Sequence, residues 1–129
     1  MNEAQLIAAT GVLAFLLVLP PLVALIQTAG LKAAAGNRAS VPALPEWANR
    51  AARAQRNMID TLVPFLALVV AAQMAGADDE NTRFAAALFF WGRTAHAVSY
   101  IAGIPYVRTV AFFAAVSGVF DIARAAWSS

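Results

Sequence analysis

The chain has no cysteine among its 129 residues and only one histidine, His96. Without cysteine it can form no disulfide, and a lone histidine with no second nitrogen or sulfur ligand argues against a metal site. Charged residues are also scarce, at 12%, and the net charge is only +2. No basic run is interleaved with aromatics, and no glycine-rich phosphate loop or Ser/His/Asp set is present. The sequence therefore does not indicate a nucleic-acid or nucleotide partner.

The chain is instead rich in apolar residues, which make up 61% of it, against about half in soluble domains. Four apolar stretches lie at about residues 6–26, 58–74, 84–101 and 107–126, each close to the roughly 20 residues that cross a bilayer core. Backbone in lipid must satisfy its own hydrogen bonds, so these stretches are predicted to be helices. We expect an all-α integral membrane protein, with one domain over residues 1–129 folded as a four-helix bundle of up-down topology.

The loops between these stretches differ in charge. The loop after the third stretch holds Arg108, and the loop after the second is acidic, with Asp78, Asp79 and Glu80. Basic loops stay in the cytoplasm, so both termini are predicted to lie outside it. The first loop and the start of the second helix carry most of the positive charge: Lys32, Arg38, Arg50, Arg53 and Arg56.

Prolines and glycines mark the predicted helix ends. Pro20 and Pro21 should kink the first helix near its end. A second helix starting at Pro45 would exceed the bilayer thickness and project as a polar stalk. Gly103 and Pro105 should make the turn into the fourth helix.

Two sets of polar residues interrupt the apolar stretches, where ionisable groups are costly and so usually functional. In the second helix, four residues recur at i, i+3, i+4 and i+7 and share one face: Arg53, Arg56, Asn57 and Asp60. In the third, Arg93, His96 and Tyr100 share another face. With Arg108 they form a cationic ring containing one acid.

This ring has more than one interpretation. Arginines match carboxylates and phosphates, so a small zwitterion with two carboxylates or an anionic lipid headgroup would fit. Alternatively, the arginines and Asp60 form an ordinary ion-pair ladder whose arginines snorkel to the interface. His96 is interpreted as a packing residue, and Asp121 with Arg124 as an ion pair rather than a site.

Two segments carry a family resemblance. Residues 53–65 read RAQRNMIDTLVPF, and residues 92–100 read GRTAHAVSY, followed by Pro105, Arg108 and Thr109. In this order they resemble the signatures of the MAPEG family, the membrane-associated proteins in eicosanoid and glutathione metabolism. Asp60 stands where that family usually has Glu. The similarity runs from about residue 50 to 113.

The resemblance implies a homotrimer with glutathione as co-substrate, bound between protomers near the cytoplasmic face. It implies a glutathione transferase or peroxidase that takes a lipophilic substrate from the membrane lipids, with Arg108 and Thr109 as catalytic residues. A non-catalytic protein of the same fold, binding a lipid or another membrane subunit, stays open, and a transport component has less support. Carried over by position, the glutathione-binding residues are Arg53, Arg56, Asn57, Asp60, Arg93 and Tyr100.

Overall fold

The first membrane span is broken in the middle by its two prolines. In a computed structural model, which describes residues 1–38 and 41–129, helix α1 covers Glu3–Leu16 and α2 covers Leu19–Ala29. Pro20 and Pro21 stand in the first turn of α2, where proline has no amide hydrogen to donate to the preceding turn. The sequence predicts a kink near the end of this helix, whereas the break lies at Leu17 and Val18, in the middle of the span, because proline disturbs the turn that precedes it. The break redirects the span: among the other spans, α1 packs mainly on the third and α2 on the second.

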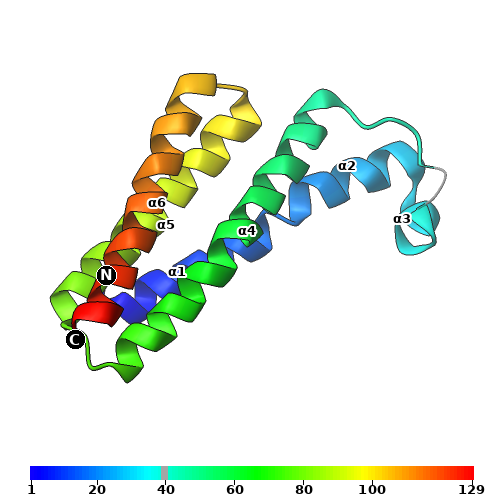
Figure 1. The fold of residues 1–129 in the computed structure, drawn as a ribbon. Coiled ribbons are helices and arrows are strands. Elements are labelled where there is room, and N and C mark those ends of the chain that lie inside the picture. Colours follow the sequence, from blue (N-terminus) through cyan, green and yellow to red (C-terminus); the bar gives the residue numbers. More distant parts are fainter. Residues whose placement is uncertain (39–40) are drawn as a thin grey trace.

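Three further long helices complete the bundle. They are α4 (Glu46–Met74), α5 (Asp79–Ala102) and α6 (Pro105–Ser128), while the short α3 (Leu31–Ala35) follows α2. Both termini and the α4–α5 turn lie toward one end of the bundle, and the start of α4 and the α5–α6 turn lie at the other (Figure 1). The all-helical, four-span fold predicted from the sequence is confirmed.

Not every span is equally apolar. Within the described residues, three helices are long and apolar enough to cross a membrane by themselves: Glu3–Ala29, counting α1 and α2 together, Glu46–Met74 and Pro105–Ser128. Helix α5 has 24 residues, which is about 36 Å at the standard rise and thus also long enough. It is not among these three because Arg93 and His96 interrupt its apolar stretch, and both side chains are enclosed by the protein.

Helices α5 and α6 approach each other closely at two glycines. A Cβ placed on Gly92 would lie 2.6 Å from the backbone nitrogen of Ala115, and one on Gly118 would lie 2.6 Å from the carbonyl oxygen of Ala85. Small residues let membrane helices pack backbone to backbone. These contacts fix how α5 is rotated against α6, and so which of its residues face α4.

On its other side α5 packs against α4 through aromatic side chains. The rings of Phe65 and Phe89 stack with their centres 3.9 Å apart and their planes nearly parallel. Both are fully buried. Two turns along α4 from Phe65 lies Met58, and one turn along α5 from Phe89 lies Arg93. The stacked pair therefore forms an apolar layer between α4 and α5, next to Met58 and Arg93.

Candidate functional site

Arg93 on α5 carries a fully enclosed guanidinium. Its Nε donates to Sδ of Met58 on α4 at 3.4 Å, and sulfur is a weak acceptor. Within residues 1–38 and 41–129, neither Nη1 nor Nη2 has a hydrogen-bond partner. An enclosed cation without a counter-ion is costly. Two charged donors of this kind are well suited to a carboxylate or another anionic group.

The same face of α5 continues through His96 and Tyr100. The His96 ring is nearly buried, with its centre 5.3 Å from that of Tyr100 and 6.1 Å from that of Phe112 on α6. These contacts are those of a packing residue, as predicted. However, Nδ1 of His96 is buried and finds no partner in the described part of the chain, so the ring also offers a hydrogen-bonding atom next to Arg93.

Arg108 of α6 is brought to this face by the α5–α6 turn. Its guanidinium carbon lies 4.7 Å from the ring centre of Tyr100, a cation–π contact. Pro105 begins α6, so Arg108 stands in the first turn, where the helix dipole adds positive potential. Thr109 is exposed, and its hydroxyl donates to the carbonyl of Pro105 at 3.1 Å. The structure thus joins Arg108 to Tyr100 and leaves Thr109 on the outer side of α6.

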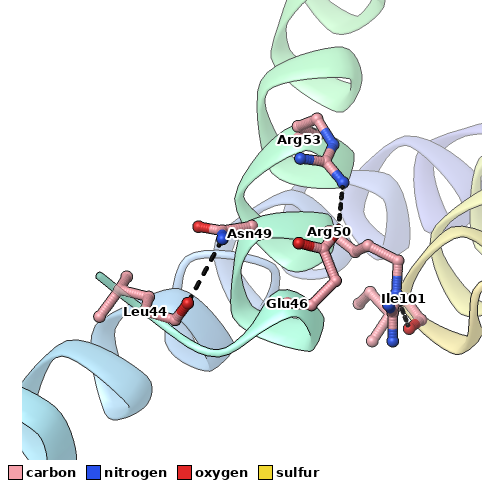
Figure 2. Close-up of polar contacts among 6 residues, drawn as sticks. All are labelled: Leu44, Glu46, Asn49, Arg50, Arg53 and Ile101. Atoms are coloured by element: carbon pink, nitrogen blue, oxygen red, sulfur yellow. Dashed lines mark hydrogen bonds and ion pairs between the residues drawn. The ribbon is translucent and has the colours of Figure 1, made fainter.

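The predicted residues of α4 are divided between the interior and the surface. Asn57 is half-buried, and its Oδ1 is enclosed with no partner among the described residues. Arg56 and Asp60 are exposed on the outward side of the helix. Arg53 pairs with Glu46 at 3.0 Å (Figure 2) and not with Asp60, so the alternative of an ion-pair ladder through Asp60 is not formed among the described residues.

The Arg53–Glu46 pair lies in the first turns of α4, ahead of its apolar part. Both side chains are more than half exposed, so the pair adds little to stability. The hydrogen bond from Arg53 lowers the pKa of the Glu46 carboxyl below its ordinary value. At the far end of α6, Arg124 and Asp121 lie 3.5 Å apart, as the ion-pair interpretation predicts. No three potential metal ligands gather anywhere in the described ranges.

Comparison with known proteins identifies the family. A sequence model of the MAPEG family matches residues 6–126. The chain belongs to the MAPEG family. Curated proteins, by contrast, include no match to it. MAPEG proteins are helical membrane proteins, and the family includes glutathione-dependent transferases and peroxidases. The resemblance seen in two motifs is confirmed and extends over nearly the whole chain.

One polar contact beside the candidate site was missed from the sequence. The sequence assigns Arg50 only to the positive charges that predict the orientation. In the structure its Nε donates to the carbonyl oxygen of Ile101 at 3.0 Å (Figure 2), and so links α4 to the end of α5. Spacing along α4 could not have revealed it, because the acceptor is a backbone atom 51 residues away.

Proposed function

We propose that this MAPEG protein is a membrane-bound, glutathione-dependent transferase or peroxidase that acts on lipophilic electrophiles. The observation that carries the proposal is the enclosed guanidinium of Arg93, whose two Nη groups lack partners in the described residues. Asn57 Oδ1 and His96 Nδ1 are enclosed and unpartnered in the same way. Unpartnered hydrogen-bonding atoms therefore occur on both α4 and α5, which suits a ligand that has donors as well as acceptors.

Glutathione has that chemistry, with two carboxylates, one ammonium and one thiol. Arg93 would donate to one carboxylate of glutathione. The amide of Asn57 and the hydroxyl of Tyr100 would form further hydrogen bonds to the same ligand. On α4, Arg53 and Arg56 would neutralise the second carboxylate, and Asp60 would pair with the ammonium. Charge-assisted contacts of this kind are roughly twice as strong as neutral hydrogen bonds.

Bound glutathione supplies a thiol whose thiolate either displaces a leaving group from an electrophilic carbon or attacks the O–O bond of a lipid hydroperoxide. In the second case the lipid leaves as the alcohol and the sulfur becomes a sulfenic acid, which a second glutathione converts to the disulfide and water. A free thiol has a pKa near about 8.5, and a neighbouring cation lowers it. Arg108 is the residue placed to do this, since its guanidinium is held over Tyr100 and the α6 dipole adds to its charge. Thr109 could donate a hydrogen bond to the thiolate only if its hydroxyl rotated away from the carbonyl of Pro105, to which it donates in the structure.

The outward residues of α4 support a trimer with the site between protomers. Arg56 and Asp60 lie on the same exposed stripe as the apolar Val63 and Val70. An ionisable side chain facing lipid costs about 2.5–3.5 kcal/mol near the bilayer centre. A neighbouring protomer would cover this stripe and bring Arg56 and Asp60 into an enclosed site. The positive charge near the start of α4 favours a cytoplasmic location for this end, with both termini outside.

A non-catalytic role is the second candidate. Thr109 is exposed and its hydroxyl is occupied by the helix backbone. In that case the same cationic residues would hold an anionic lipid headgroup or another membrane subunit, and no thiol chemistry would follow.

Calorimetric titration of the detergent-purified protein with glutathione tests the proposal. Wild type should bind, and Arg93→Gln should lose most of the affinity, because its charged donors are gone. Arg124→Gln removes an exposed arginine of α6 that pairs with Asp121 and should leave binding unchanged. A folded wild-type protein that binds no glutathione would instead support the lipid or subunit role.

A further inference from the structure

We propose that Arg50 is a positioning residue of the glutathione site, holding the end of α5 and the α5–α6 turn in place for Tyr100 and Arg108. This inference rests on the proposed function. Its starting point is the contact already described, in which Nε of Arg50 donates to the carbonyl of Ile101 at 3.0 Å. Arg50 is half-buried, so the contact is not a loose surface pairing.

The carbonyl of Ile101 needs an outside donor. A helix leaves its last carbonyls without partners in the helix itself. At the end of α5, the amide of Ile104 bonds to the carbonyl of Ser99, and that of Gly103 to the carbonyl of Tyr100. These two bonds close the turn in the usual glycine-capped way. The next carbonyl, that of Ile101, receives the guanidinium of Arg50, and a cation there also matches the negative end of the α5 dipole.

The side chain of Arg50 also lies against the turn. Gly103 adopts a left-handed conformation, with φ +79°, and a Cβ added to it would lie 3.6 Å from both Cζ and Nε of Arg50. The guanidinium therefore packs over the residue at which the chain reverses. Movement of the turn away from α4 would break this packing and the hydrogen bond together.

The turn carries the residues on which the chemistry depends. Tyr100 directly precedes Ile101, and Arg108 follows within the first turn of α6, with its guanidinium 4.7 Å from the Tyr100 ring centre. Two side-chain hydrogen bonds of the described residues join α4 to the body and the end of α5: Arg93 to Met58 deep in the bundle, and Arg50 to Ile101 at its end. Arg53 of α4 also interacts with the side chain of Tyr100. Loss of the Arg50–Ile101 bond would loosen the turn and with it the distance of Arg108 from a thiol held on α4.

The experiment compares wild type with Arg50→Gln, Arg50→Lys and the control Arg83→Gln, which removes an exposed arginine at the start of α5. The pKa of bound glutathione is read from the ultraviolet absorbance of its thiolate across a pH series. In Arg50→Gln the thiol pKa should rise by about one unit, which means a roughly tenfold smaller thiolate fraction near neutral pH. Arg50→Lys should restore part of the shift, because its ammonium can also donate to the Ile101 carbonyl.

The outcomes are distinct. If wild type binds glutathione and the thiol pKa is the same in Arg50→Gln, Arg50 is a structural residue only and this inference is wrong. If Arg83→Gln shifts the pKa equally, the effect is general electrostatics and the inference is also wrong. If folded wild type binds no glutathione, the proposed function fails, and the inference with it.

Discussion

The guanidinium of Arg93 and the thioether of Met58 meet between α5 and α4, with Nε 3.4 Å from Sδ and neither side chain exposed. A thioether provides no charge to balance the arginine, so the residue remains available to a ligand. An acid in place of Met58 would provide that charge from within the chain. The proposed binding role of Arg93 therefore depends on an uncharged neighbour at this position.

Met58→Glu tests this relationship. A carboxylate next to Arg93 should pair with it and compete with the ligand, so glutathione affinity should fall by tenfold or more, a loss of at least about 1.4 kcal/mol. Met58→Gln has the same shape without the charge and should bind more tightly than Met58→Glu. Titration calorimetry compares them, and equal affinities would contradict a direct role for Arg93.

Removal of Arg108 should change the pH dependence of turnover. The cation favours the thiolate, so in Arg108→Gln the thiol pKa should rise toward about 8.5. The rate at neutral pH should then fall and recover as the pH rises through that value. Tyr100→Phe keeps the aromatic ring over which Arg108 lies and should show little of this shift. A pH–rate profile unchanged in Arg108→Gln would exclude the arginine from thiol activation.

The close approach of α5 and α6 should not tolerate a methyl group. In Gly92→Ala the new Cβ would meet the backbone of Ala115 at 2.6 Å, so the helices must separate, at a cost of about 1–3 kcal/mol. Gly11→Ala in α1 meets nothing within 4 Å and should be neutral or slightly stabilising. Thermal unfolding in detergent measures both, and equal midpoints would contradict the tight packing.

Glu3 joins three helices at the end of the bundle that holds the termini. Its carboxylate accepts from Gln73 of α4 at 2.9 Å and from the buried Thr82 of α5 at 2.7 Å. Glu3→Gln removes the charge assistance and should cost about 1 kcal/mol in unfolding free energy. Glu80→Gln, on an exposed neighbour, is the control. Glutathione affinity should stay unchanged in both, because the proposed site lies at the other end.

If the protein is a trimer, its protein mass should be three times the 13.6 kDa of the single chain. Native mass spectrometry after release from detergent gives this directly. Asp60→Lys places a second cation beside Arg56 on the outward stripe of α4 and should lower the trimer fraction by like-charge repulsion. If wild type were recovered only as a dimer or a monomer, the proposed trimer would be wrong.

The amino-acid sequence by itself determined the number of spans, their helical state and most of their ends. Apolar run length in lipid permits few other structures, and Pro20, Gly103 and Pro105 act on the backbone locally, wherever the rest of the chain lies. Spacing also placed Arg93, His96 and Tyr100 on one face, because a helix repeats every 3.6 residues.

Only the tertiary structure decided which faces meet. The contacts at Gly92 and Gly118 set the rotation of α6 against α5. Arg108 consequently lies over Tyr100, while Thr109, about 100° further round the helix, faces outward. The partner of Arg93 and the acceptor of Arg50 are likewise on other helices. Periodicity describes one helix at a time, so it cannot give the relative rotation of two helices or the atoms that this rotation brings together.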